Sequence, residues 1–400
     1  MTPERDHDIC IIGGAGHVGL PLALVFARAG QRVLVYDLNQ TALDTIKGGV
    51  MPFTEYDAEP LLTSALRERR LTFSSDARDI ARGRNVIVAV GTPVDEYLNP
   101  KLRALLDLFQ SVRPHLDPEQ TIIIRSTVFP RTCRHVLRSL TKGGGVWHVA
   151  YCPERIAQGY AIRELNELPQ IVSGCSQEAI DRATELFSMI APQIILLEVE
   201  EAELAKLFTN AWRYIQFAAA NQFYMIAQSI GVDFNHVRKA MVDGYGRAAS
   251  LPSAGFAAGP CLLKDTMQLA AFNANGFTLG QAAMGINEGL PSFLVENLKR
   301  RHKLDETRVG ILGMAFKAEI DDIRDSLSYK LGKVLRFHGA EVYYSDEFAK
   351  DPTFITKDQL VERSDVVIVG VPHSAYRTLV VPGHVEVVDL WGVIESGEAC

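Results

Sequence analysis

A glycine-rich turn near the start of the chain constrains the fold more than any other stretch. Residues 8–13, which precede it, form a continuous apolar run typical of a parallel strand buried on both faces. The turn reads Gly14-Ala-Gly-His-Val-Gly19 and opens an apolar helix that we expect to end near Ala29. A second strand follows and ends at Asp37. Strand, glycine turn, helix, strand and acid in this order are a dinucleotide-binding fingerprint.

The residues of this fingerprint indicate which dinucleotide is bound. Gly14, Gly16 and Gly19 allow a tight turn and let a pyrophosphate approach the backbone at the helix N-terminus. Asp37 is expected to accept hydrogen bonds from ribose hydroxyls and to repel a 2′-phosphate, which favours NAD over NADP. The alternative is a glycine turn that binds no ligand.

Composition excludes several classes of protein. The chain has 400 residues, 47% of them hydrophobic, and a net charge of −7, so we expect two or three domains and no binding of nucleic acid. No run approaches the roughly 18 apolar residues of a membrane span, and the polar start does not resemble a signal peptide. Six scattered cysteines without CxxC pairs predict neither disulfides nor a metal site, and they favour a cytoplasmic location.

Polar residues follow three further predicted strands, at the edge where ligands of parallel sheets bind. The third strand ends in Gly91 and Thr92, the fourth in Ser126 and Thr127, and the fifth in Glu154. We expect Gly91 and Thr92 to line the cofactor site. The alternatives are a plain strand-end turn for the first pair and helix caps for the other three.

The middle of the chain is predicted to be helical. Residues 203–230 contain neither Pro nor Gly and predict one long helix, and Asp233 is a good N-cap for the next. Lys206 and Asn210 lie four residues apart and therefore on one face of the long helix. A lysine in so apolar a helix needs a partner or a function. Apolar positions indicate that much of the remaining helix surface is buried: Leu204, Phe208, Trp212 and Ile215.

The last hundred residues repeat the pattern of the first. Four apolar strands are predicted, at residues 308–313, 341–346, 365–372 and 385–389. We therefore predict an α/β fold with two Rossmann-like doubly wound sheets joined by a central helical domain that contains the long helix. The predicted domains are residues 1–200, 201–302 and 303–400.

The predicted C-terminal sheet lacks the glycine fingerprint. Gly313-Met-Ala-Phe-Lys317 stands in its place, so no second dinucleotide is expected there. Lys317, backed by Arg324, suits a simpler phosphorylated ligand. The alternative is that both side chains only pair with the acids of the same stretch, Asp321, Asp322 and Asp325.

Residues 255–265 display a cysteine in a loop of small residues. Gly259 and Pro260 precede Cys261, and Lys264 and Asp265 follow it. Small residues let a ligand approach the backbone closely, and nearby cations stabilise a thiolate. Cys261 is therefore a candidate nucleophile, and the alternative is an ordinary buried thiol.

These stretches together resemble the UDP-glucose/GDP-mannose dehydrogenase family, the NAD-dependent nucleotide-sugar 6-dehydrogenases, over nearly the whole chain. The resemblance rests on eight motifs in the family's order: Gly14-Ala-Gly-His-Val-Gly-Leu-Pro21, Val90-Gly-Thr-Pro93, Ser126-Thr-Val-Phe-Pro130, Cys152-Pro-Glu-Arg155, Lys206-Leu-Phe-Thr-Asn-Ala211, Gly259-Pro-Cys-Leu-Leu-Lys-Asp265, Gly313-Met-Ala-Phe-Lys317 and Asp321-Asp-Ile-Arg-Asp-Ser326. It implies two oxidations of the sugar C6 alcohol, to aldehyde and then to acid, with two NAD consumed. A cysteine captures the aldehyde as a thiohemiacetal, whose oxidation gives a thioester that water hydrolyses.

The resemblance also implies residue roles. Cys261 is the nucleophile, Asp265 handles protons through a water, Lys206 and Asn210 stabilise the developing oxyanion, and Glu154, with a water held by Thr127, serves as base for hydrolysis. The implied cofactor-binding residues are Gly14, Gly16, His17, Val18, Gly19, Asp37, Gly91, Thr92, Ser126 and Thr127. The implied substrate-binding residues are Glu154, Arg155, Lys206, Asn210, Arg247, Gly255, Phe256, Lys317 and Arg324. Arg247 is expected to reach the substrate of a neighbouring subunit. The long helix forms the dimer core in relatives, so at least a homodimer is expected.

Some positions bear on the choice of sugar. Arg131 stands where relatives often have glycine, and Ala-Ala-Gly-Pro precedes Cys261 where many have Gly-Gly-Ser or Gly-Gly-His. The motif 151–155 and Arg247 resemble the UDP-N-acetylhexosamine branch, whereas the pair 264–265 resembles the UDP-glucose branch. A UDP-N-acetylhexosamine is the expected substrate, with UDP-glucose or GDP-mannose as alternatives.

Two other functions fit parts of the sequence. A single-hydride dehydrogenase of the 6-phosphogluconate or 3-hydroxyacyl type shares the N-terminal sheet and a helical domain, but it needs neither the Cys261 loop nor residues 306–400. A catalytically inactive NAD or nucleotide-sugar sensor would first lose its chemical residues, and Cys261, Lys206 and Asn210 are all present.

Overall fold

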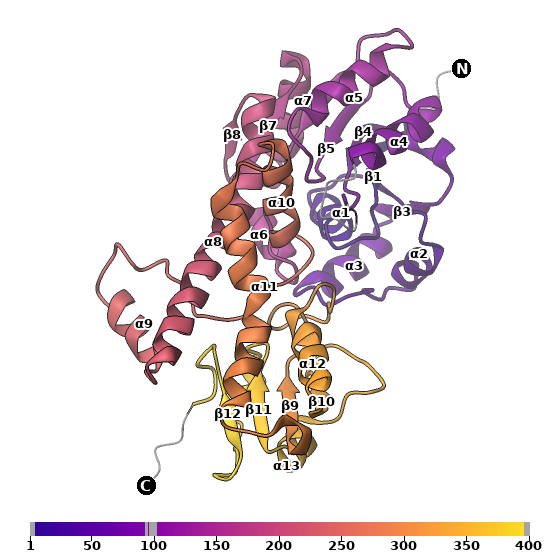
Figure 1. Cartoon of the computed structure of the whole chain (residues 1–400). Coiled ribbons are helices and arrows are strands. Elements are labelled where there is room, and N and C mark those ends of the chain that lie inside the picture. The colour runs from indigo at the N-terminus through magenta and orange to yellow at the C-terminus, as the bar shows by residue number, and fades with distance from the viewer. Residues whose placement is uncertain (1–4, 93–94, 96–101, 396–400) are drawn as a thin grey trace. The chain divides into compact units, whose positions relative to one another are not determined.

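The chain divides into two compact units, Met1–Thr209 and Asn210–Cys400 (Figure 1). The computed structural model describes residues 5–92, 95 and 102–395. The boundary between the units lies inside a long helix, α8 (Val199–Ser229). The division into three domains at residues 200 and 302 stays a prediction.

The first unit contains a sheet with eight strands among the described residues, in the order β3-β2-β1-β4-β5-β6-β7-β8. Neighbouring strands run parallel, except β6 and β7, which are antiparallel. The strands are β1 (His7–Ile12), β2 (Val33–Tyr36), β3 (Leu71–Ser74), β4 (Gly83–Val88), β5 (Thr121–Ile124), β6 (His148–Tyr151), β7 (Gln170–Gly174) and β8 (Ile194–Leu196). The strand order reverses beside β1, and ligands of such sheets bind at this point of reversal.

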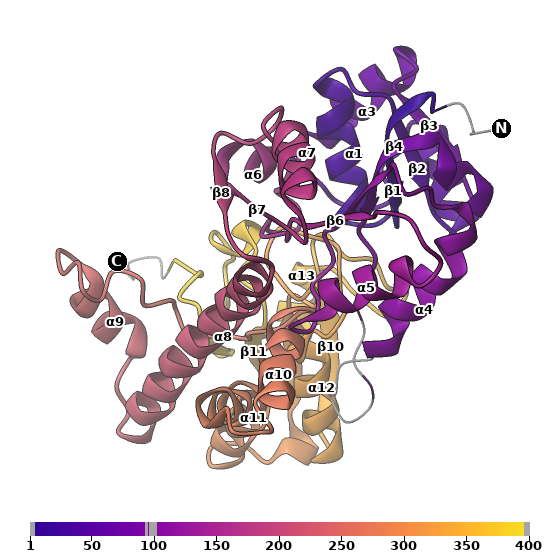
Figure 2. The same ribbon diagram turned by 90° about the horizontal axis from the view of Figure 1, so that it is seen from above.

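Helices cover both faces of this sheet. They are α1 (Gly19–Arg28), α2 (Gln40–Lys47), α3 (Ala58–Arg67), α4 (Leu102–Val112), α5 (Thr132–Thr141), α6 (Ala161–Glu167) and α7 (Gln177–Phe187). Ile9 and Ile11 of β1 pack in one core with α1 and α3, whereas Cys10 and Ile12 pack in another with α4 and α5. Figure 2 shows these two helix pairs on opposite sides of the sheet. Burial of both strand faces explains why the strands are apolar without alternation.

The central helical region contains α8, α9 (Phe234–Val242), α10 (Leu262–Phe272) and α11 (Thr278–Lys299). The long helix begins at Val199, before the predicted start at Glu203, and ends one residue before the predicted Ile230. Asp233 caps α9 as predicted, because its Oδ1 accepts a hydrogen bond of 2.8 Å from the N–H of Asn235. No helix of the described residues is long and apolar enough to cross a membrane.

The expectation that the apolar surface of α8 is buried is wrong for one of its faces. Phe208 and Trp212 are 55% and 59% exposed, and Phe223, Ile226 and Ile230 are exposed as well. At about 100° per residue the four of these side chains that lie within α8 fall within about 60° of the helix circumference, and Ile230 directly follows the helix. We call these five residues the α8 stripe. The helix buries another face, with Leu207, and so leaves this one uncovered in the single chain.

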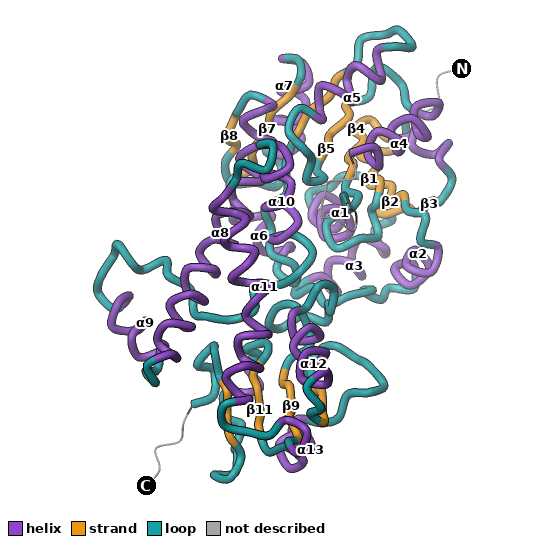
Figure 3. Tube along the Cα trace, in the orientation of Figure 1, coloured by secondary structure: helices purple, strands orange, loops and turns teal. Residues whose placement is uncertain are grey.

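The second unit contains a parallel sheet with four strands among the described residues, in the order β10-β9-β11-β12. The strands are β9 (Arg308–Leu312), β10 (Glu341–Ser345), β11 (Val366–Val369) and β12 (Glu386–Val388), and the helices beside them are α12 (Leu327–Phe337) and α13 (Lys357–Arg363). Figure 3 shows β9 and β11 with α12 and α13 next to them. The predicted fold class, two Rossmann-like sheets joined by a helical region, is thereby confirmed.

Candidate active site

The glycine turn after β1 fits the phosphates of a dinucleotide. A Cβ on Gly14 would lie 2.8 Å from the carbonyl oxygen of Ile11, and a Cβ on Gly19 would lie 2.3 Å from that of Gly13. The closest atom to a Cβ on Gly16 would be 3.4 Å away, so the turn is open there. Because α1 begins at Gly19, the positive end of its helix dipole lies at this turn. This backbone geometry fits an anion such as a pyrophosphate, and the contact of the turn with NAD stays a prediction.

Asp37 follows β2 and is bonded to the glycine turn. Its Oδ2 accepts a hydrogen bond of 3.1 Å from the N–H of Ala15, and its Oδ1 accepts one of 3.0 Å from the N–H of Asn39. The acid therefore lies at the strand end where ribose hydroxyls bind in such folds. Its bond to Ala15, which the sequence pattern does not reveal, connects the acid directly to the turn.

His17 has partners from two distant loops. Its ring lies 4.0 Å from the ring of Phe53, centroid to centroid, and its Nδ1 lies 3.1 Å from Nε2 of Gln158. Val18 is the N-cap residue of α1. The fingerprint singles out His17 and Val18 but gives no sign of Phe53 or Gln158, because neither belongs to a local pattern.

Hydroxyl groups join the loops after β4 and β5. Thr92 Oγ1 donates a hydrogen bond of 2.7 Å to the carbonyl oxygen of Thr127, and Ser126 Oγ donates one of 2.7 Å to that of Val90. Among the described residues, no atom lies within 4 Å of the place where a Cβ on Gly91 would stand. The N-cap of α5 is Arg131, so Ser126 and Thr127 are not its caps. Contacts of these residues with the cofactor stay predictions.

Arg131, which stands where relatives often have glycine, has a backbone conformation that favours glycine. Its φ is +74°, a left-handed conformation that glycine adopts freely and that costs other residues about 1–2 kcal/mol. The N–H groups of Arg131 and Cys133 donate hydrogen bonds of 2.5 and 2.9 Å to the buried carboxylate of Glu203. These two bonds stabilise the conformation and fix the start of α5.

Glu154 is held in a buried ion pair. Its carboxylate contacts the guanidinium of Arg125 and accepts hydrogen bonds from the N–H groups of Arg155 (2.5 Å) and Ile156 (2.6 Å). Arg125 also donates to Oε1 of Gln170 at 3.0 Å and is 2% exposed. In the sequence, the only sign of this ion pair is that a basic residue, Arg125, directly follows the apolar run 121–124. The pair places the positive charge of Arg125 directly beside the Glu154 carboxylate and fixes its orientation.

Arg155 uses its side chain within the first unit. Its guanidinium donates to the carbonyl oxygen of Pro169. The predicted contact of Arg155 with substrate therefore competes with an internal bond.

Two polar side chains of α8 that were predicted as catalytic, Lys206 and Asn210, are buried one turn apart. Asn210 Nδ2 donates a hydrogen bond of 2.6 Å to Oδ2 of Asp265, which is fully buried. Lys264 Nζ lies 2.8 Å from the other oxygen, Oδ1. The structure thus brings together Asn210 and Asp265, which are distant in sequence.

Cys261 is the N-cap residue of α10 and is exposed, so the alternative of a buried thiol is wrong. By contrast, Cys10, Cys133 and Cys152 are buried, and burial raises the pKa of each thiol. The positive end of the α10 dipole favours an anion at Cys261. Asp265 follows one turn later, and its N–H donates to the carbonyl oxygen of Cys261 at 2.9 Å.

Arg324 is oriented by one of its neighbouring acids. Its Nε lies 3.0 Å from both oxygens of Asp322. These hydrogen bonds raise the pKa of Arg324, and the nearby sulfur of Cys261 adds to the effect. Arg324 therefore pairs with an acid of its own stretch, while its charge also lies near the cysteine, and the predicted contacts of Lys317 and Arg324 with substrate stay predictions.

The loop before Cys261 is fixed by hydrogen bonds and by close packing against aromatic side chains. Asn221 on α8 bonds both backbone groups of Gly255, donating to its carbonyl oxygen at 3.0 Å and accepting from its N–H at 2.8 Å. A Cβ on Gly255 would collide with Trp391, and one on Gly259 would lie 2.5 Å from the ring of Phe316. The loop needs these glycines for close packing. Phe256 is buried beside them.

Arg247 lies in the segment after α9 and is exposed. Its expected contact with the substrate of a neighbouring subunit stays a prediction.

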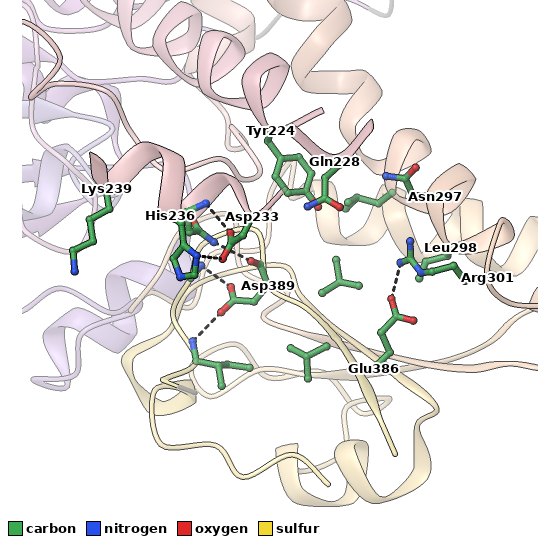
Figure 4. Close-up of a pocket in the computed structure, with 16 residues that line it drawn as sticks. Tyr224, Gln228, Asp233, His236, Lys239, Asn297, Leu298, Arg301, Glu386 and Asp389 are labelled. Atoms are coloured by element: carbon green, nitrogen blue, oxygen red, sulfur yellow. Dashed lines mark hydrogen bonds and ion pairs between the residues drawn. The ribbon is translucent and has the colours of Figure 1, made fainter. Parts of the chain in front are cut away.

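A cavity of about 550 Å³ in the second unit, lined in part by α9, α11 and β12, contains none of the predicted site residues (Figure 4). Four of its charged side chains form two pairs. Arg301 Nη2 lies 2.6 Å from Oε1 of Glu386, and His236 Nδ1 lies 3.6 Å from Oδ2 of Asp233. Burial raises the pKa of Asp389, whose carboxylate accepts hydrogen bonds from backbone N–H groups. Because most of these charges have partners within the protein, the lining points to no particular ligand.

A sheet with a dinucleotide turn, followed along the chain by a helix that begins at an exposed cysteine and by a second α/β sheet, is the architecture of an NAD-dependent dehydrogenase. The chain belongs to the UDP-glucose/GDP-mannose dehydrogenase family. Residues 7–191 match its NAD binding domain, residues 200–288 its central domain and residues 310–396 its UDP binding domain. The predicted family, the NAD-dependent nucleotide-sugar dehydrogenase class and the NAD cofactor are confirmed.

Relatives of this chain bear names from two branches of the family. A UDP-N-acetyl-D-mannosamine dehydrogenase of Methanocaldococcus jannaschii is 29% identical over 92% of this chain and 86% of its own. The solved structure of a UDP-D-ManNAc dehydrogenase from Pyrococcus horikoshii matches with a TM-score of 0.89 and 27% identity, over 97% of this chain and 96% of its own. A UDP-glucose dehydrogenase from Pyrobaculum islandicum also gives a TM-score of 0.89, with 26% identity over 98% of this chain and 96% of its own.

Proposed function

We propose that this protein oxidises the C6 alcohol of a UDP-N-acetylhexosamine, with UDP-N-acetylmannosamine as first candidate, to the uronic acid. The names of the relatives from Methanocaldococcus and Pyrococcus support this sugar. UDP-glucose is the alternative, supported by the equally similar Pyrobaculum structure. The UDP binding domain supports a nucleotide-sugar as substrate in either case.

The first unit is proposed to hold the cofactor. NAD, when bound, accepts one hydride in each of two successive oxidations. Gly14, Gly16 and Gly19 would hold its pyrophosphate and Asp37 its ribose, while Gly91, Thr92, Ser126 and Thr127 would line the rest of the site. The open side of the turn at Gly16 and the place of Asp37 at the end of β2 support this assignment.

The observation that carries the proposal is the exposed Cys261 at the start of α10, one turn before a buried and doubly held Asp265. An aldehyde carbon cannot lose a second hydride until a nucleophile has added to it. The thiolate would form a carbon–sulfur bond to C6, which gives a thiohemiacetal once its oxygen is protonated. The second oxidation removes the hydrogen on C6 and the proton on oxygen, leaving a thioester. Water then adds to C6, the carbon–sulfur bond breaks, and the acid and free thiol are released.

The remaining residues are assigned supporting roles. Lys206 and Asn210 would stabilise negative charge on the C6 oxygen. Glu154, oriented by Arg125, would take the proton of the attacking water, and Thr127 would hold that water. Lys317 and Arg324, with the buried loop of Gly255 and Phe256, would bind the nucleotide-sugar.

The α8 stripe supports a homodimer. It consists of four exposed apolar side chains on one helix face and of Ile230 just after the helix, and a second copy of the same helix is a self-complementary partner. Replacement of Trp212 and Ile226 by Glu should convert the dimer into monomers in light scattering. A wild-type protein that is monomeric at micromolar concentration would contradict this proposal.

A Cys261→Ser variant tests the proposed chemistry. It should form no uronic acid while its affinity for NAD stays unchanged. Cys175→Ser, a change at a partly buried thiol outside the site, is the matched control and should retain activity. If Cys261→Ser produces acid at the wild-type rate, the thioester route is wrong. If wild type binds NAD but oxidises no nucleotide-sugar, the protein is a sensor.

A further inference from the structure

The loop between β9 and α12, residues 313–326, carries Lys317 and Arg324, both proposed above to bind the nucleotide-sugar. Two non-glycine residues of this loop have a left-handed backbone, Glu319 with φ +63° and Asp325 with φ +54°. Such residues persist only where the surroundings hold them, because each costs on the order of 1–3 kcal/mol. The loop is therefore shaped by contacts from outside itself.

One of these contacts comes from His373, which follows β11 and is completely buried. The backbone N–H of Glu319 donates a hydrogen bond of 3.0 Å to Nδ1 of His373. The Glu319 side chain adds a second connection, because its Oε1 accepts a bond of 2.6 Å from the N–H of Ser374. Glu319 is thus attached to the β11 end by its backbone and by its side chain.

The hydrogen bond from Glu319 fixes the tautomer of His373. Since Nδ1 accepts a hydrogen bond from an N–H group, the ring hydrogen is on Nε2. Nε2 lies 3.2 Å from Oδ2 of Asp346, at the end of β10, and donates to it. The ring itself is stacked on Phe348, with centroids 4.9 Å apart, and meets the edge of Tyr376 at 5.4 Å.

Asp346 holds the beginning of the same loop. Its Oδ2 also accepts hydrogen bonds from the N–H groups of Met314 (2.6 Å) and Ala315 (2.9 Å). Asp37 makes the corresponding bond to Ala15 in the first unit. The Asp346 side chain, however, has no exposed surface. In the second sheet the acid therefore accepts hydrogen bonds from the protein itself and is not exposed to a ribose.

Lys317 lies between the two fixed points, two residues after Ala315 and two before Glu319. We propose that His373 is a positioning residue for the nucleotide-sugar, because its Nδ1 holds Glu319 and thereby sets the backbone that presents Lys317. This inference rests on the proposed function, in which Lys317 binds the substrate.

Two substitutions test the hydrogen bonds of the two ring nitrogens of His373 separately. Asn carries an oxygen at the place of Nδ1, so His373→Asn can still accept from Glu319 but cannot reach Asp346. Gln carries a donor at the place of Nε2, so His373→Gln can serve Asp346 but offers nothing to Glu319. Tyr376→Phe is the control, because its hydroxyl is buried and makes no hydrogen bond among the described residues.

The measurements are KM for the UDP-sugar, KM for NAD, kcat, the Kd of UDP by calorimetry and the melting temperature, all on the full chain. His373→Gln should raise KM for the UDP-sugar and Kd for UDP about tenfold, the effect of one buried hydrogen bond, with kcat and KM for NAD unchanged. His373→Asn should melt at a lower temperature yet keep KM within about threefold of wild type. Tyr376→Phe should change none of these.

If His373 had a purely structural role, KM for the UDP-sugar would rise in whichever variant has the lower melting temperature. His373→Asn would then have the higher KM of the two variants. That result, or a His373→Gln protein with wild-type UDP affinity, would overturn the inference. Lys317→Ala distinguishes this failure from failure of the proposed function. If Lys317→Ala weakens UDP binding while His373→Gln does not, only the role of His373 is wrong. If wild type binds no UDP and oxidises no UDP-sugar, both proposals fall.

Discussion

The side-chain amide of Asn210 donates a hydrogen bond of 2.6 Å to the carboxylate of Asp265, one helical turn after Cys261. Lys264 holds the other carboxylate oxygen at 2.8 Å. Asp265 is completely buried, so both of its oxygens need such partners. The bond also connects α8 to the helix that begins at the proposed nucleophile.

Asn210→Ala should therefore impair both stability and catalysis. It leaves a buried carboxylate oxygen without its donor, which costs about 1–3 kcal/mol in the free energy of unfolding. Loss of a group proposed to stabilise the oxyanion should lower kcat about 100-fold. Thr209→Ala, at the neighbouring exposed position, is the control and should leave kcat unchanged. Equal kcat for both variants would remove Asn210 from the proposed mechanism.

Asp37 should determine the choice between NAD and NADP. Asp37→Asn keeps an oxygen that can accept from Ala15 but removes the charge that repels a 2′-phosphate. We expect KM for NAD to rise about tenfold and the preference for NAD over NADP to shrink by more than that. Asp37→Ala should show the same loss of preference and a lower melting temperature. An unchanged ratio of kcat/KM for the two cofactors would show that Asp37 does not face the ribose.

Arg125 should be important for the stability of the first unit. Arg125→Met leaves the Glu154 carboxylate buried without its charged partner, at a cost of about 3–5 kcal/mol. Arg134→Met breaks an exposed pair with Glu200 and should cost at most about 1 kcal/mol. Urea denaturation of both variants and of wild type measures the two losses in the free energy of unfolding. Similar losses for the two would mean that the buried pair is no stronger than a surface pair.

Asp346 should make folding of the second unit sensitive to acid. Burial alone would raise its pKa, but hydrogen bonds from His373 and from backbone N–H groups outweigh burial and lower the pKa of Asp346 to about 2. A lowered pKa in the folded state stabilises above the unfolded pKa of about 3.9, and the stabilisation is lost as pH falls toward 2. The loss should be on the order of 2 kcal/mol.

Urea denaturation between pH 6 and pH 2.5 tests this prediction. Wild type should lose stability below about pH 4 more steeply than Asp346→Asn, in which no carboxyl titrates at this position. Parallel curves for the two proteins would mean that another carboxyl is responsible.

Local sequence patterns predicted those structural features that depend only on neighbouring residues. The glycine turn, the acid at Asp37 and the cap at Asp233 each depend on a few neighbouring residues, and the structure has them at the predicted places. The buried runs of the strands likewise follow from burial on both sheet faces. These features could be predicted because one short segment contains their cause.

Pairings between distant segments could not be predicted in this way. Arg125 with Glu154, Glu203 with Arg131, and Asp346 with His373 each join residues whose approach depends on how strands are ordered. The exposure of Phe208 and Trp212 was missed for a related reason. An apolar helix face looks the same in sequence whether its own chain or another copy covers it.

The yield of NADH per nucleotide-sugar tests the central claim most directly. Purified protein would be given a limiting amount of UDP-N-acetylmannosamine, UDP-N-acetylglucosamine, UDP-glucose or GDP-mannose with excess NAD, and NADH and uronic acid would be counted at completion. The proposed double oxidation predicts two NADH and one acid per sugar, with UDP-N-acetylmannosamine as the preferred substrate. One NADH per sugar and no acid would contradict it, because the reaction would then end after a single oxidation and Cys261 would have no covalent role.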